Sequence, residues 1–92
     1  MNNDICKSII ERKVLGFRYK GVDRTVEPHC YGVQINGKPG LCAWQVDGGS
    51  GEGFRLFVVD EMGVAHIGRS FDGPRPGYRR GDSRFGTIYA EL

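Results

Sequence analysis

The chain has 92 residues, of which 39% are hydrophobic and 11% aromatic, so it supports one small hydrophobic core and excludes a disordered segment or a two-lobed enzyme. A net charge of +2 excludes a protein that holds polyanions by overall charge alone. Basic residues predominate in residues 1–38 and 69–92, and acidic residues predominate between them. We therefore expect one globular domain, residues 1–92, in which the fold decides whether the basic ends share a surface.

The three cysteines, Cys6, Cys30 and Cys42, have no CxxC spacing, and no apolar run is long enough for a signal peptide or a membrane span. We expect a reduced, cytoplasmic protein that does not contact a membrane. A zinc site would need Cys30 and Cys42 with a histidine, but the adjacent His29 and Cys30 point to opposite faces of a strand. The sequence predicts no metal and no cofactor, and thiols that act as small buried hydrophobic groups.

An N-terminal helix is expected within residues 1–13. Asn2 or Asn3 is a suitable cap, and Asp4 favours the first turn. Lys13 or Val14 would end the helix. The apolar stripe expected to face the core consists of Ile5, Ile9 and Ile10.

Short strands separated by turns that contain Gly or Asp are predicted for the rest of the chain. The fifteen glycines are spread through these turns, which is typical of a strongly curved sheet. In the first strand, alternation places Leu15, Phe17 and Tyr19 on the core face. The five predicted strands are residues 14–20, 24–35, 41–46, 54–60 and 64–67.

Two local signals constrain the middle of this meander. Asn36-Gly37 predicts a hairpin, because both residues tolerate the positive φ angles of a tight turn. In the second strand the apolar parity changes between Cys30 and Tyr31, so we expect a bulge or bend near Gly32. Pro28 cannot donate to a sheet ladder, which places it at an edge or at that irregularity.

The region 69–92 forms a predicted extension in which arginines alternate with aromatic residues. Gly73-Pro74 and Pro76-Gly77 indicate a long loop. Residues 86–91 are expected to form a final strand that adds Ile88 or Tyr89 to the core.

The order of motifs along residues 5–71 resembles the WYL-domain family. The resemblance is carried by Tyr19, by Arg24-x-Val26-x-Pro28, by Leu41 after the hairpin, and by Arg55-x-Phe57-x-Val59-Asp60. It implies a mainly β fold, with one N-terminal helix and a compact five-stranded barrel of the Sm or SH3-like type in residues 14–68. It also implies a sensor for nucleotides or single-stranded nucleic acid.

The sequence departs from the family pattern at two places. Pro39-Gly40 stands where the family has the aromatic pair of its name, and Val58 stands where it has a second basic residue. WYL domains usually follow a winged-helix DNA-binding domain, which these 92 residues do not contain. The expected module would therefore signal through a partner or through self-association.

The leading candidates for ligand binding are Arg24 and Arg55, since a guanidinium offers phosphate a planar fork of donors. Tyr19 and Trp44 are the candidates for stacking on a base, and the resemblance adds Phe57 to the site. The alternative for the arginines is structural pairing with Glu27 or Asp60. The alternative for the aromatic residues, above all Tyr19, is an ordinary place in the core.

Three arginines of the extension, Arg75, Arg79 and Arg80, would extend a nucleic-acid surface in which cations follow the phosphate backbone and neighbouring rings receive bases. The alternative is that they only keep a loop soluble.

No motif for catalysis is complete. The glycine-rich residues 47–53 lack the Lys-Ser or Lys-Thr of a phosphate-binding loop and precede a strand, so a hairpin loop is expected. Ser50 lacks the GxSxG frame of a hydrolase. His29 and His66 have no partner in the sequence, and we expect each at the surface or half-buried. No catalytic residue is predicted.

These observations favour a non-enzymatic regulatory or sensor module that binds a nucleotide or single-stranded nucleic acid. The resemblance places it in bacterial transcriptional regulation or defence. The alternative is a protein–protein interaction module, or homo-oligomer, without a ligand, and a small enzyme is the third. Binding that weakens steeply with salt would identify the nucleic-acid binder.

Overall fold

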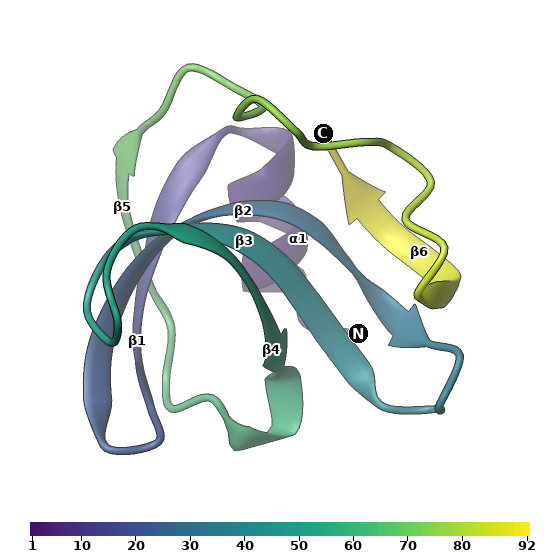
Figure 1. Ribbon diagram of the computed structural model, residues 1–92, viewed down its shortest axis with the longest axis horizontal. Helices are drawn as coiled ribbons and strands as arrows, with labels where there is room; N and C mark the ends of the chain where they lie inside the picture. Colours follow the sequence, from purple (N-terminus) through teal and green to yellow (C-terminus); the bar gives the residue numbers. More distant parts are fainter.

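The computed structural model describes residues 1–92 as a mainly β domain with one short N-terminal helix (Figure 1), which confirms the expected mainly β class and N-terminal helix. All strands belong to one antiparallel, six-stranded sheet in the order β4-β3-β2-β1-β5, and the last strand pairs with β2. The elements are α1 (Asn3–Ile10), β1 (Lys13–Tyr19), β2 (Val22–Gln34), β3 (Pro39–Asp47), β4 (Gly53–Val58), a 3-10 turn η1 (Val59–Glu61), β5 (His66–Ser70) and β6 (Phe85–Glu91).

The sheet curves strongly but does not close, so the expected five-stranded closed barrel is corrected to an open sheet of six strands (Figure 1). β4 pairs only with β3, and β5 pairs only with β1. The chain after η1 is attached to β1 before β5 begins, because the Gly63 amide donates to the Arg18 carbonyl at 2.8 Å and Met62 bridges Tyr19.

Helix α1 is shorter than predicted. The Asn2 side chain caps it by accepting the Ile5 amide at 3.1 Å, as expected for a helix that begins at Asn3. Ile5 and Ile9 are buried, but Ile10 is 76% exposed, which corrects its place in the stripe. The helix ends there because Arg12 has a φ of 54° and turns the chain directly into β1.

Both predicted features of the β2 region are present, with changes. The Asn36-Gly37 hairpin is confirmed, but only Gly37 has a positive φ, of 86°, and the Asn36 side chain accepts the Lys38 amide instead. The inward face of β2 does switch. Its register shifts between Pro28 and Cys30 against β3, and between Tyr31 and Gly32 against β6. A side chain at Gly32 would collide with the backbone of β6.

The curved sheet has a core on each face. The inner core lies between α1 and the sheet, and it contains the predicted Leu15, Phe17 and Tyr19. The outer core is smaller and consists of Cys30, Cys42 and Phe85, with partly buried neighbours. β6 contributes Ala90 to the inner core and packs Ile88 against the outer one, whereas Tyr89 is 42% exposed.

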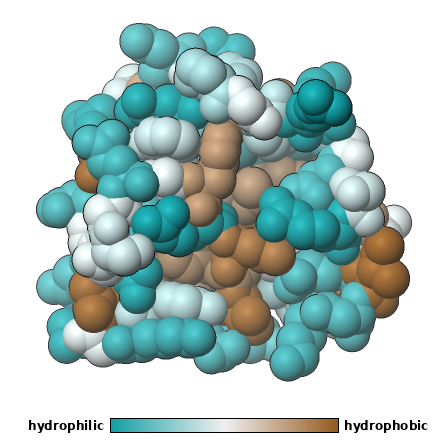
Figure 2. Space-filling model, viewed as in Figure 1, coloured by the Kyte–Doolittle hydropathy of each residue, from teal (hydrophilic) through white to brown (hydrophobic).

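Figure 2 shows one face of the molecule, on which hydrophobic side chains lie in a central hollow surrounded by hydrophilic ones. No helix has the length and apolar character needed to cross a bilayer.

Candidate functional site

The first arginine cluster lies on the inner face and is called here the inner arginine site: Arg24, Gln45 and Arg55. Arg24 donates to the Gln45 side-chain oxygen at 3.1 Å and to the Tyr19 carbonyl at 3.2 Å. Gln45 is fully buried, and its Nε2 donates to the carbonyls of Gly48 at 2.6 Å and Gly51 at 2.7 Å. Arg24 thus supports the glycine-rich loop 47–53 through Gln45.

Arg55 binds the same loop directly. Its Nη2 donates to the Ser50 hydroxyl at 3.0 Å and to the Gly51 carbonyl at 3.1 Å, and its Nη1 donates to the Phe54 carbonyl at 2.9 Å. Neither predicted arginine pairs with Glu27 or Asp60. The structural role that the two arginines share is therefore to hold main-chain carbonyls, and the Arg24 Nε is the one buried guanidinium nitrogen left without a partner.

The predicted aromatic residues are divided between the two faces. Tyr19 and Phe57 are buried on the inner face with ring centroids 4.9 Å apart, and the Tyr19 hydroxyl accepts the Val58 amide at 3.1 Å. Trp44 lies on the outer face, with its ring edge-to-face against Phe54 at 5.1 Å. The structure therefore brings Tyr19 and Phe57 to Arg24, whose guanidinium lies 5.5 and 6.0 Å from their ring centroids, but it does not bring Trp44 there.

The second group of cations lies on the outer face, in residues 71–84, which we call the strap. Figure 1 shows this segment running from β5 to β6 along one end of the sheet. Arg75 donates from Nε and Nη2 to the two carboxylate oxygens of Glu27, at 2.7 and 3.1 Å, and its guanidinium lies 5.1 Å from the Trp44 ring centroid. Glu27 is 4% exposed and the Arg75 side chain is 37% exposed, so this predicted nucleic-acid residue pairs with a buried carboxylate.

His29 is fully buried beneath the strap, which corrects its predicted place at the surface or half-buried. The rings of Phe54, Phe71 and Tyr78 surround it at centroid distances of 5.3, 6.1 and 4.9 Å. Burial lowers the His29 pKa below its ordinary value, against smaller opposing contributions from Glu27. The imidazole is therefore neutral at pH 7. His66, by contrast, is exposed on β5, as expected.

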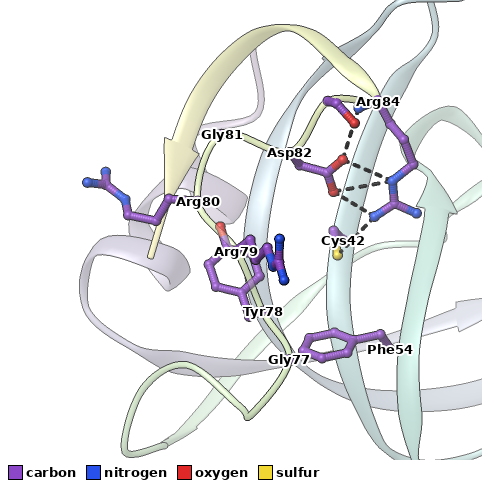
Figure 3. Close-up of a pocket in the computed structure, with 10 residues that line it drawn as sticks. Cys42, Phe54, Gly77, Tyr78, Arg79, Arg80, Gly81, Asp82 and Arg84 are labelled. Carbon is purple, nitrogen blue, oxygen red and sulfur yellow. Dashed lines mark hydrogen bonds and ion pairs between the residues drawn. The ribbon is translucent and has the colours of Figure 1, made fainter.

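The end of the strap forms an open pocket of about 400 Å³ against β3 and β4, called here the arginine pocket (Figure 3). Arg84 is fixed at its rim by Asp82, whose Oδ2 accepts from Nη2 while Oδ1 accepts from Nε at 3.0 Å. These hydrogen bonds hold the Asp82 pKa below its usual range. The pocket is lined by Cys42, Phe54, Gly77, Tyr78, Arg79, Arg80, Gly81, Asp82, Ser83 and Arg84.

Arg79 and Arg80 behave differently although they are adjacent. In Figure 3 the Arg79 side chain turns toward Cys42, whereas the Arg80 side chain extends away from it. Arg80 pairs with Glu91 at 3.2 Å, and its side chain is 71% exposed. The Arg79 side chain forms no hydrogen bond and no ion pair with any group of the protein. It is thus the one arginine of the pocket whose donors are all available.

The Cys42 thiol belongs to the wall of the pocket. Burial raises its pKa, although Arg84, whose Nη2 lies 3.5 Å from the sulfur, opposes the shift. Burial also raises the pKa of Cys30, which pairs with Cys42 across the strands, to about 12. Both thiols are therefore protonated at pH 7, and their packing in the outer core agrees with the role expected for them.

Sequence reasoning missed most residues of the outer face. Phe54 and Tyr78 form the walls of the pocket, and Asp82 orients Arg84. The spacing of Asp82 and Arg84, two residues apart in a loop, was a usable signal. Glu27 had no such signal, because its partner Arg75 is 48 residues away along the chain.

Comparisons with protein-family models, with curated proteins and with solved structures gave no match. The resemblance to WYL domains rests on the sequence motifs alone and stays a prediction.

Proposed function

We propose that this protein is a non-enzymatic binding module for a phosphate-bearing ligand, a nucleotide or a short single-stranded nucleic acid, and that the ligand occupies the arginine pocket. The observation that carries the proposal is Arg79. It lines a cavity of about 400 Å³ and has no acceptor in the protein, whereas Arg24 and Arg55 already donate to the protein's own oxygens. Free guanidinium donors beside a cavity are what an anionic ligand requires.

The rest of the pocket supports the same ligand class. Arg84 is held in place by Asp82, so its charge is oriented before a ligand arrives. Phe54 and Tyr78 provide aromatic wall beside these charges, which suits a ligand with one planar and one anionic part. The volume lies within the range of small-molecule sites, about 300–1,000 Å³. The protonated Cys42 thiol favours binding over nucleophilic catalysis at this position.

The biological role follows the resemblance. A mainly β domain with an N-terminal helix agrees with a WYL-like sensor. From the strong curvature of the sheet we infer a relation to Sm or SH3-like barrels. We place the protein in bacterial transcriptional regulation or defence, where it would signal through a partner or a second copy. A ligand in the arginine pocket would contact the strap, and the strap would present the bound state to that partner.

The test is calorimetric titration with oligo(dT), adenosine monophosphate and inorganic phosphate at low salt. Replacing Arg79 with alanine removes charge-assisted hydrogen bonds worth about 1.5–3 kcal/mol, so the affinity should fall roughly 10- to 100-fold. Arg55→Ala is the matched control, because it removes an arginine from the inner face and should leave the affinity unchanged. Loss of binding in Arg55→Ala but not in Arg79→Ala would move the site to the inner arginines.

A protein–protein interaction module is the second candidate, and β5 is the observation that favours it. All five residues of β5 are exposed, and the strand pairs on one side only. Val64 and Ile67 add exposed apolar side chains at 80% and 42%. An added strand would complete this edge. Absence of any ligand binding at millimolar concentration, together with a partner affinity that does not change with salt, would favour this function.

A further inference from the structure

Three contacts join Arg75 and Tyr78 of the strap to β2, at His29 and Glu27. The Arg75 amide donates to His29 Nε2 at 3.0 Å, and the Arg75 guanidinium binds both carboxylate oxygens of Glu27. The Tyr78 hydroxyl donates to the His29 carbonyl at 3.1 Å. Tyr78 also lines the arginine pocket, so the contacts that hold the strap continue directly into the pocket wall.

The hydrogen bonds define the tautomer of His29. Nδ1 lies 2.7 Å from the Glu27 carbonyl oxygen, which only accepts, so the ring proton is on Nδ1. Nε2 is then the acceptor that the Arg75 amide requires. The neutral imidazole satisfies both partners, and the strap can close over it.

A proton on Nε2 removes that match. Nε2–H would face the Arg75 N–H, so two donors would oppose each other, and a buried cation would lie beside the Arg75 guanidinium. Glu27 is the nearby anion, but Arg75 already binds both of its oxygens. The charged or titratable groups around His29 are Glu27 and Cys30 of β2, Arg75 and Tyr78 of the strap, and Glu91 of β6, which is engaged by Arg80 and the Gly81 amide. β4 contributes the uncharged Phe54 here.

We propose that His29 is a proton-operated latch for the strap: protonation releases Arg75 and loosens residues 77–84, so that the arginine pocket binds its ligand when His29 is neutral and loses it on acidification. The ligand half of this inference rests on the proposed function above. The release of the strap does not.

The direction of the pH dependence follows from burial. Because His29 favours the neutral form in the closed state, the latch opens below the ordinary histidine value of about 6.5. Linkage to one proton limits the change in ligand affinity to about tenfold per pH unit in the range where the latch opens.

The experiment follows the free protein by NMR between pH 8 and pH 4.5. The Arg75 amide resonance should shift with the same midpoint as the His29 ring, and the amides of Arg79 and Arg80 should change with it. Arg75→Ala removes the repelling cation and frees the Glu27 carboxylate, so the His29 midpoint should rise. His66→Gln, on the exposed β5, is the control and should leave the midpoint unchanged. Titration of His29 without any change at the Arg75 amide would overturn the latch.

The ligand half is tested with short oligo(dT), because a phosphodiester keeps its charge over this pH range. We expect the natural protein to bind oligo(dT) more weakly below the His29 midpoint than above it. A folded His29→Gln variant should keep its affinity at acidic pH. Equal affinity on both sides of the midpoint would overturn the latch while the proposed function stands. Release of the strap with no binding of oligo(dT) or adenosine monophosphate at any pH would leave the release of the strap standing and overturn the proposed function.

Discussion

The two arginine clusters of this small sheet have the same residue type but different partners. On the inner face, Arg24 and Arg55 support the loop 47–53 through a buried glutamine, a hydroxyl and main-chain carbonyls. On the outer face, Arg75 and Arg84 bind carboxylates, and Arg79 binds nothing in the protein. An arginine therefore indicates a binding site only when its donors remain unused, and that depends on acceptors that the rest of the fold supplies.

The inner and outer faces also differ in their hydrophobic cores. We expect the largest loss of stability from a substitution in the inner core. Phe57 is 1% exposed and contacts Phe17 and Tyr19, so Phe57→Ala should lower the free energy of unfolding by about 3–5 kcal/mol. Phe54 is half-buried on the outer face, so Phe54→Ala should lower the free energy of unfolding clearly less. Urea denaturation of both variants measures the difference, and equal losses would contradict the ranking of the two cores.

A smaller difference in stability is expected between glycine substitutions in the loop 47–53 and in the strap. Gly48 has a φ of 97°, and an added Cβ would collide with the Asp23 carbonyl, so Gly48→Ala should cost about 2 kcal/mol or more. Gly81 in the strap has a φ of 69° with open space around it, so Gly81→Ala should cost about 1 kcal/mol from backbone strain alone. Thermal melts of the two variants test this, and a larger loss at Gly81 would reverse the comparison.

The smallest effect concerns Asp82. Its folded pKa is lowered by Arg84, so the carboxylate adds stability that is present above its unfolded value of about 3.9 and is lost as the pH falls through the folded value. Asp82→Asn should be less stable than the natural protein at pH 7, by about 1 kcal/mol or less. The two proteins should converge once the pH lies below the folded pKa of Asp82, where the carboxylate is protonated. Urea midpoints at pH 7 and below that pKa measure the gap, and a gap that persists in acid would mean that charge is not its cause.

Local patterns predicted the parts of the fold that depend on neighbours in sequence. Alternation identified Leu15, Phe17 and Tyr19, and Asn36-Gly37 marked its hairpin. A turn between the strands 14–20 and 24–35 was also expected, but its position at Lys20-Gly21, with φ values of 50° and 78°, had no signal, because lysine does not favour that conformation.

The candidate site was harder to predict because its contacts are distant in sequence. His29 meets Arg75 46 residues later, and nothing near His29 indicates that the strap will cover it. Arg24 and Arg55 were identified as important cations, but each donates to a main-chain carbonyl, of Tyr19 and of Gly51 respectively, and every residue has a carbonyl, so no pattern distinguishes these partners. Sequence therefore located the charges, and the fold determined which of them are satisfied.

The long strand β2 is shared by three partners, since β3 pairs along most of it, β1 along its first half and β6 along its second. The pairings with β1 and β3 are hairpins of low contact order, whereas β6 must close a chain segment of more than 50 residues to reach β2. Folding should therefore build the β1–β4 meander first and add β6 last. Until β6 arrives, the second half of β2 presents an unpaired edge to other chains, so the strap contacts also protect the protein from edge-to-edge aggregation.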